Sequence, residues 1–136
     1  MGSAGCVATL TESPSSIALP AQVESVDFTI VAEGADEPVF PTIVFVPTEQ
    51  QIRITGTLWG GNSCYETRLR SIEYDTQADA LTTRVGVTRV RSTCPDSTGT
   101  DTYELLITMQ SQLPTVVTAT HSDAEDNSAT TTARPA

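Results

Sequence analysis

Arginine side chains are concentrated in one central stretch of this chain, where they suggest a site for anions. A guanidinium group presents five N–H donors in a planar fork that fits a carboxylate or a phosphate. Six of the seven basic residues lie in this stretch: Arg53, Arg68, Arg70, Arg84, Arg89 and Arg91. An anionic glycan or an acidic protein is the partner that such a group would bind.

Strand alternation indicates which of these arginines share a surface. Arg53, Arg68 and Arg70 are predicted to point away from the core, with Arg84 and Arg91 as neighbours across a hairpin. These five arginines belong to the candidate binding site. The alternative is that they form cross-strand ion pairs. The carboxylates available for such pairs are Glu66, Glu73 and Asp75.

Trp59 completes the candidate binding site. It alternates onto the same outward face as Thr55 and Thr57, beside the glycine-rich segment 60–63. An exposed indole at that place can stack on a sugar ring or fill a partner's pocket. The alternative is that Trp59 folds over the rim of the domain.

Cys64 and Cys94 flank the predicted central hairpin. Pairing Tyr74 with Leu81 sets Cys64 opposite residue 90 or 91, so Cys94 overshoots by about three residues, or roughly 10 Å. Since a disulfide needs Cα atoms within about 7 Å, residues 91–93 would have to turn back toward residues 61–63. Two buried thiols or a metal site are the alternatives, although zinc needs more soft ligands than these cysteines and His121 supply.

Cys6 makes the cysteine count odd and leaves one thiol for another use. It follows Gly2-Ser3-Ala4-Gly5, and small residues that end in Gly-Cys resemble the end of a lipobox, whose cysteine receives a lipid after the signal peptide is removed. A lipid on Cys6 would anchor the protein to the outer face of the cell membrane. Residues 1–22, rich in Ser, Ala, Pro and Thr, are predicted to be a flexible tether.

No residue pattern predicts catalysis, a metal site or a cofactor. His121 lies near Asp123, Glu125 and Asp126, but these residues fall in a predicted tail that cannot hold a fixed geometry. Nucleophile elbows, phosphate loops and paired carboxylate motifs are absent from the sequence. We therefore expect a protein that is not an enzyme.

The elements that position these residues are predicted to be strands, because polarity alternates with a period of two. About seven are expected, near residues 26–30, 39–46, 52–58, 65–74, 81–87, 103–109 and 115–120. Prolines confine the second strand to a sheet edge or to two short pieces, and the three-residue step from Leu69 to Ile72 indicates a bulge. An antiparallel, immunoglobulin-like β-sandwich over residues 23–121 follows. Residues 122–136 contain no large apolar residue and are predicted to be a disordered acidic, Thr-rich tail.

The charge balance indicates the medium in which the protein works. The chain of 136 residues has 17 acidic and 7 basic residues, a net charge of −10, and no lysine. This composition is typical of an extreme halophile, where high salt screens the self-repulsion of a carboxylate-rich surface. The same acidity argues against nucleic-acid binding, which requires a basic footprint.

Several segments together resemble the small, largely uncharacterised lipoproteins of halophilic archaea. They are Ala4-Gly5-Cys6 and five stretches within residues 52–121, namely ITGT, GGNSCY, RSIEYDTQADAL, TCP and LPTVVTATH. The resemblance implies lipid attachment at Cys6, a Cys64–Cys94 disulfide and a β-sandwich, and it implies no activity. We expect a lipid-anchored extracytoplasmic binding or structural module. The alternative is a soluble regulatory β-sandwich, such as a proteinase-inhibitor-like domain that presents residues 59–65.

Overall fold

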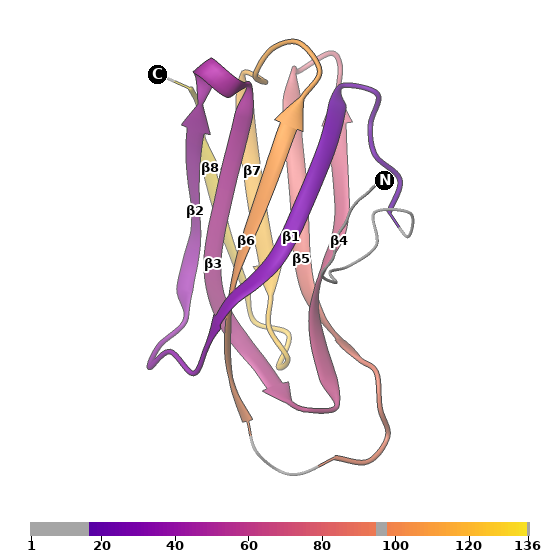
Figure 1. Ribbon diagram of the computed structural model, residues 1–136, viewed down its shortest axis with the longest axis vertical. Coiled ribbons are helices and arrows are strands. Elements are labelled where there is room, and N and C mark those ends of the chain that lie inside the picture. The colour runs from indigo at the N-terminus through magenta and orange to yellow at the C-terminus, as the bar shows by residue number, and fades with distance from the viewer. Residues whose placement is uncertain (1–16, 95–97, 136) are drawn as a thin grey trace.

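The computed structural model describes residues 17–94 and 98–135, and strands make up most of them. The strands are β1 (Val23–Glu33), β2 (Val39–Val46), β3 (Gln51–Asn62), β4 (Tyr65–Asp75), β5 (Ala80–Arg89), β6 (Thr98–Met109), β7 (Val116–Ser122) and β8 (Ser128–Ala133). They form two four-stranded sheets that pack face to face (Figure 1). The predicted all-β sandwich is confirmed.

Sheet A has the strand order β1-β6-β3-β2, and sheet B has the order β4-β5-β7-β8. Neighbouring strands are antiparallel except for β5 and β7, which run parallel. Sheet B therefore consists of two hairpins joined by a parallel seam. The edge strands β2 and β8 belong to different sheets and lie side by side at one edge of the sandwich (Figure 1).

One core fills the space between the sheets, because alternate residues of each strand face inward. Its fully buried aliphatic side chains come from four strands: Ile52, Ile54, Leu58, Leu81, Leu105, Ile107 and Val117. Burial of each such side chain contributes about 1.5–3 kcal/mol. The period-two pattern read from the sequence thus corresponds to one apolar face on each sheet.

Two irregularities predicted from the sequence are found in the strands. β2 is an edge strand, and its register with β3 shifts between Val39 and Thr42, around the buried Pro41. The register of β4 with β5 shifts between Leu69 and Ser71, which makes Arg70 the extra residue of a bulge. Tyr74 pairs with Leu81 as expected.

The prediction of a disordered tail over residues 122–136 is wrong. Ser122 ends β7, a turn follows, and Ser128–Ala133 forms β8, which pairs with β7 over its whole length. Hydroxyl groups support this pairing on the outer face, since Thr118 and Thr132 are hydrogen-bonded at 3.2 Å, and Thr120 and Thr130 at 2.9 Å. The strand holds without large apolar side chains because threonine favours β-structure and the backbone groups pair.

The predicted tether also ends earlier than residue 22. Ile17 and Leu19 are half-buried and pack against the core, and the backbone N–H of Val23 donates to the carbonyl of Pro20 at 3.0 Å. These apolar contacts attach the segment before β1 to the domain. The rest of the predicted tether, including Cys6, lies outside the described residues.

Candidate functional site

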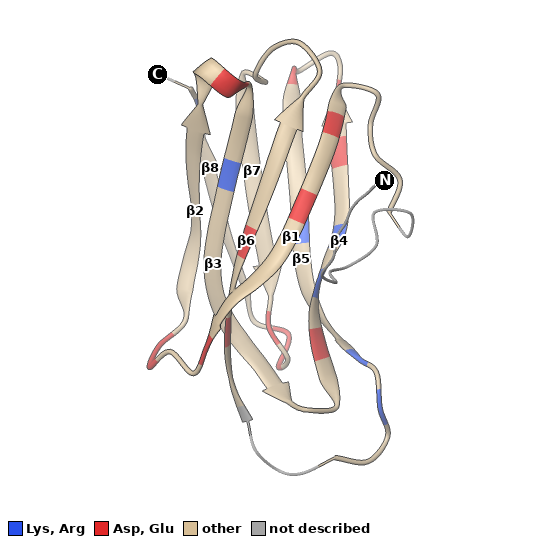
Figure 2. Cartoon of the chain, in the orientation of Figure 1, with Lys and Arg blue, Asp and Glu red and all other residues tan. Residues whose placement is uncertain are grey.

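Five of the arginines follow the β4–β5 hairpin of sheet B and the loop after it (Figure 2). We call them the arginine face: Arg68, Arg70, Arg84, Arg89 and Arg91. The first three lie on the outward side of the hairpin, because Arg68 pairs with Gly86 and Arg84 with Ser71, between inward-facing rows. Arg89 is the last residue of β5 and lies opposite Tyr65 at the end of the ladder, in the same row as Val85 and Val87, and Arg91 lies in the loop that follows.

Arg70 depends on the bulge and on a glycine across the hairpin. Its guanidinium Nη1 donates to Oγ1 of Thr88 at 3.0 Å, so the side chain crosses from β4 to β5. A Cβ atom on Gly86 would lie 3.2 Å from Cγ of Arg70, closer than most carbon contacts. The aliphatic part of the Arg70 side chain therefore packs directly against the backbone of Gly86.

Carboxylates neutralise only part of the arginine face. Glu66 pairs with Arg68 on the same strand, with Oε1 and Nη2 2.7 Å apart. Within the described part of the chain, Arg70 and Arg84 form no ion pair, and Arg84 is exposed on the outer side. Glu73 and Asp75 lie opposite Thr82 and Ala80 in the β4–β5 ladder, not opposite an arginine. The Glu66–Arg68 ion pair lies within β4, so among the described residues the alternative of cross-strand ion pairs with Glu66, Glu73 and Asp75 is not seen on this face.

Aromatic and backbone contacts hold the last two arginines. The guanidinium carbon of Arg89 lies 5.5 Å from the centre of the Tyr65 ring, and Nη1 donates to the Tyr65 hydroxyl at 3.1 Å. Nη1 of Arg91 donates to the carbonyl of Ser63 at 2.7 Å. Since these donors contact neutral groups and neither arginine forms an ion pair among the described residues, both guanidinium charges remain available to an anion.

The Cys64–Cys94 disulfide fixes the loop that carries Arg91. The two Cα atoms are 5.5 Å apart. The carbonyl of Cys64 accepts hydrogen bonds from the N–H groups of Val90 at 2.6 Å and Arg91 at 3.2 Å. The chain thus turns back toward the β3–β4 connection, as a bridge at this register requires. The side chain of Asn62 supports the same turn, since Oδ1 accepts from the backbone N–H of Cys64 at 2.9 Å.

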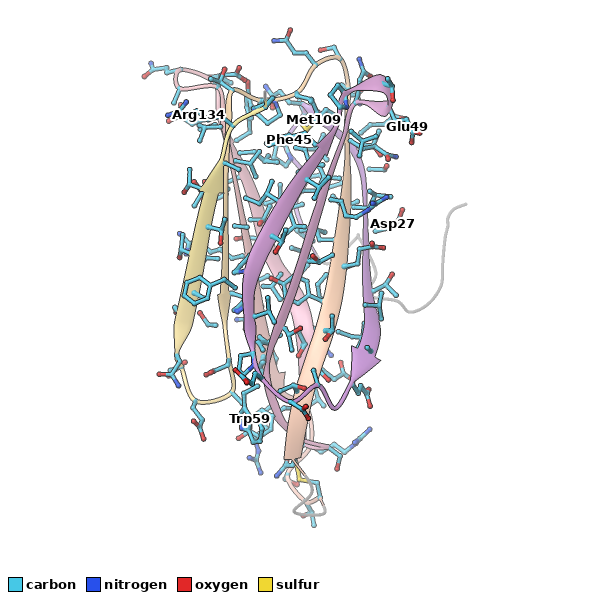
Figure 3. All side chains as sticks on the ribbon, turned by 90° about the vertical axis from the view of Figure 1, so that its left-hand side faces the viewer. Asp27, Phe45, Glu49, Trp59, Met109 and Arg134 are labelled. Carbon is cyan, nitrogen blue, oxygen red and sulfur yellow. A yellow bond between two sulfur atoms is a disulfide. The ribbon has the colours of Figure 1, made fainter. Side chains whose placement is uncertain are left out.

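Two members of the predicted site lie elsewhere. Arg53 is on β3 in sheet A and pairs with Glu104 of β6 at 3.4 Å, so the sandwich separates it from the arginine face. Trp59 is also on β3 and is half-buried near the end of the sandwich (Figure 3). Its carbonyl accepts from the N–H of Ala124 at 2.9 Å. The β7–β8 turn therefore packs against this segment, and the prediction of one surface that contains Arg53, Trp59 and the β4–β5 arginines is wrong.

His121 belongs to the core, contrary to the prediction that it lies beside a disordered tail. It is 4% exposed on β7, and its Nδ1 is hydrogen-bonded to the hydroxyl of the buried Tyr103 on β6 at 2.9 Å. Burial lowers the pKa of His121 despite the opposing charge of Asp123, and burial raises the pKa of Tyr103. This pair joins the two sheets, and its lack of access to solvent suits a structural bond. Sequence reasoning missed it because the last strand was expected to end at residue 120, and β8, which pairs with β7 through His121, was not foreseen.

Asp79 is a second polar residue with a structural part. Its Oδ2 accepts hydrogen bonds from the backbone N–H of Thr115 at 3.1 Å and from Oγ1 of Thr115 at 2.6 Å, and its Oδ1 accepts from the Tyr74 hydroxyl. The bond from the Thr115 side chain is the main reason that the pKa of Asp79 lies below its usual value. Asp79 thereby ties the β4–β5 turn to the start of β7. The Tyr74 hydroxyl takes part in the same connection, and its hydrogen bond to Asp79 is the main reason that the pKa of Tyr74 is raised.

The described residues contain no cluster of three His, Cys, Asp or Glu side chains that could hold a metal ion. Residues 17–94 and 98–135 also include no long apolar helix of the kind that spans a bilayer. No family model, curated protein or solved structure matches the chain. The candidate functional site is therefore the arginine face, and it rests on the placement of these side chains in the structure.

Proposed function

We propose that this protein is a lipid-anchored, extracytoplasmic binding module of a halophile that takes an anionic partner on its arginine face. The observation that carries the proposal is the placement of five of the seven arginines along one hairpin and its following loop, on a chain of net charge −10. Arginine forks bind carboxylates, sulfates and phosphates in two-point contacts. An anionic glycan or an acidic protein segment fits this face.

The test is retention on an immobilised polyanion such as heparin. We expect Arg84→Gln to lower the salt concentration at which the protein elutes, and Arg70→Gln to add to this effect, because fewer charges then contact the polymer. Arg53→Gln is the matched control, since it removes the same charge from the opposite sheet. Equal shifts for Arg84→Gln and Arg53→Gln would mean that net charge alone governs retention, and the proposal would fail.

The anchor is proposed to be a lipid on Cys6. Support comes from the small residues before it and from the disulfide, which uses both other cysteines and leaves Cys6 as the odd thiol. Expression of the full-length gene in a haloarchaeal host should place the wild-type protein in the membrane fraction and Cys6→Ser in the soluble fraction. Equal partitioning of the two proteins would contradict lipid attachment.

A soluble regulator that presents residues 59–65 has less support. This segment is strand except for Ser63 and Cys64, which form a tight turn. A proteinase-inhibitor-like contact needs a projecting loop, and the carbonyl of Trp59 is already bonded to the β7–β8 turn.

A further inference from the structure

Three of the four edge strands carry features that prevent other strands from adding to them. β1 has two register shifts and several carboxylates, among them the exposed Asp27. β2 has a register shift around Pro41, and β4 has the bulge at Arg70 together with charged side chains. Bulges, prolines and charges are the usual means by which proteins protect a sheet edge.

β8 is the exception among the four. It contains no charge, no proline and no bulge, and its six residues pair with β7 without interruption. Alternate residues of an edge strand direct their N–H and C=O groups away from the sheet, so β8 presents a regular row of backbone groups that have no partner among residues 17–94 and 98–135. Its side chains are only Ala, Ser and Thr, which leave close access to that row.

We propose that β8 pairs with β8 of a second copy of this chain, antiparallel and around a two-fold axis at Thr131. In this register Thr130 faces Thr132 of the other copy, Ala129 faces Ala133, and Ser128 faces Arg134. No like charges meet within the strand, and each pair combines small side chains. A two-fold interface requires such self-complementarity.

Charge complementarity at the two ends favours a second copy as the occupant. Arg134 directly follows β8, is exposed, and has no ion-pair partner among the described residues. The turn before β8 contains Glu125 and Asp126, both exposed. Antiparallel pairing brings Arg134 of each copy close to this acidic turn of the other copy. Arg134 faces Ser128, and Asp126 lies two residues before Ser128, roughly 7 Å along the strand, which an arginine side chain can span.

Exposed apolar side chains on β2 give a second, independent argument. Val39, Phe40 and Val44 are 52%, 64% and 45% exposed, and β2 lies beside β8 at the same edge of the sandwich (Figure 3). Three large exposed apolar residues on one strand are unusual for a surface that meets only water. The two-fold axis that joins the β8 strands also brings the β2 strands of both copies toward each other, so it shields part of this surface.

Sedimentation velocity over a dilution series tests the proposal, with Cys6→Ser in every protein so that no intermolecular disulfide forms. We expect a reversible dimer. Thr130→Lys with Thr132→Lys should raise its dissociation constant at least roughly tenfold, or about 1.4 kcal/mol, because lysines then face one another across the axis. The control is Thr118→Lys with Thr120→Lys, which breaks the same hydroxyl pairs and adds the same charge one strand away from the edge. This control should dimerise like the parent.

A charge exchange tests the register itself. Arg134→Glu should weaken the dimer, and Arg134→Glu with Ser128→Arg should restore it, because these two positions face each other only in the antiparallel arrangement around Thr131. A chain that stays monomeric at every concentration overturns the proposal, as does equal weakening by the β7 control pair. A monomer whose β8 amides resist hydrogen exchange also overturns it, since another segment of the chain would then cover the edge.

Discussion

At the scale of single residues, Gly56 shows how one contact fixes the identity of a core position. It pairs with Tyr103 on the inner face of sheet A. A Cβ atom on Gly56 would lie 2.7 Å from the Tyr103 hydroxyl oxygen and 3.0 Å from Nδ1 of His121. The absence of a side chain therefore makes room for the Tyr103–His121 hydrogen bond between the sheets.

Replacement of Gly56 by alanine is expected to destabilise the fold by about 1–3 kcal/mol, because the added methyl group overpacks the core. Gly99→Ala is the matched control, since no atom lies within 4 Å of a Cβ atom at that glycine of the neighbouring strand β6. Urea unfolding of the two variants measures the difference. Equal free energies of unfolding would refute this account of Gly56.

His121 should make the fold sensitive to mild acid. Its neighbours in the core are Tyr103 from β6 and Gly56 from β3, and Asp123 is the charged group that acts on it. Because burial lowers its pKa below the ordinary 6.5, the unfolded chain binds a proton more readily than the folded chain. Stability should therefore fall as the pH drops from 6.5 toward the pKa of the folded state.

Thermal unfolding between pH 7.5 and 5.5 measures this effect. His121 is the only histidine of the chain, so His121→Gln should remove the pH dependence in this range. The same slope in wild type and variant would show that other groups cause it.

At the scale of elements, the disulfide links the stability of the fold to the geometry of the arginine face. It closes a loop with a sequence separation of 30 residues, which corresponds to about 3–4 kcal/mol in the chain-entropy model. The same bridge holds the turn whose N–H groups bond to the carbonyl of Cys64. Loss of the bridge should therefore affect both folding and binding.

We expect Cys64→Ala with Cys94→Ala to unfold at a lower urea concentration and to elute earlier from heparin, because Arg91 is then less fixed. Intact mass after denaturing alkylation, with and without reductant, verifies the bridge in the parent protein. Arg91→Gln in the parent isolates the part of the binding loss that comes from Arg91. An unchanged elution position of the double variant would show that the bridge does not organise the binding face.

The sequence predicted elements well where side chains differ in polarity along a strand. The step from Leu69 to Ile72 predicted a bulge near Arg70 or Ser71, because a change of phase in the apolar row requires an extra residue, and the structure identifies that residue as Arg70. β8 escaped prediction because Ala, Ser and Thr provide no contrast between its two faces. Its threonines were a signal for β-structure, but only the pairing with β7 distinguishes it from a polar tail.

At the scale of the whole molecule, the acidic surface and the arginine face should respond to salt in opposite ways. Carboxylates lie on many loops and strands of both sheets, whereas the basic residues follow mainly the β4–β5 side (Figure 2). Salt screens the mutual repulsion of the carboxylates, and it also screens the attraction between the arginines and an anion.

The free energy of unfolding should therefore rise as NaCl increases from about 0.1 M to about 1 M, where the Debye length falls from about 10 Å to about 3 Å. Polyanion binding should weaken over the same range. Urea unfolding and equilibrium binding on the same samples measure both effects. A stability that falls with added NaCl would contradict the halophilic interpretation.

The candidate site could be predicted only in part, for a reason that belongs to the whole molecule. Alternation showed correctly that Arg53, Arg68 and Arg70 point outward, because it depends on local backbone geometry. It could not show that the tight turn after β3 carries the chain from sheet A to sheet B. Arg53 on β3 and Arg68 and Arg70 on β4 all point outward, but they lie on opposite sides of the sandwich because β3 and β4 belong to different sheets.

The parallel seam between β5 and β7 has a consequence for the order in which the domain folds. The β4–β5 and β7–β8 hairpins each join strands that are close in sequence, so each can form early from local contacts. The seam pairs Ala80–Val85 with Val116–His121, which are separated in the sequence by β6 of the other sheet, so we expect it to form later than either hairpin. Since Val85 and His121 face each other at the end of the seam, the closing step of folding also completes the Tyr103–His121 bond. The slow phase of refolding should therefore report the meeting of the two hairpins, with His121 as its natural probe.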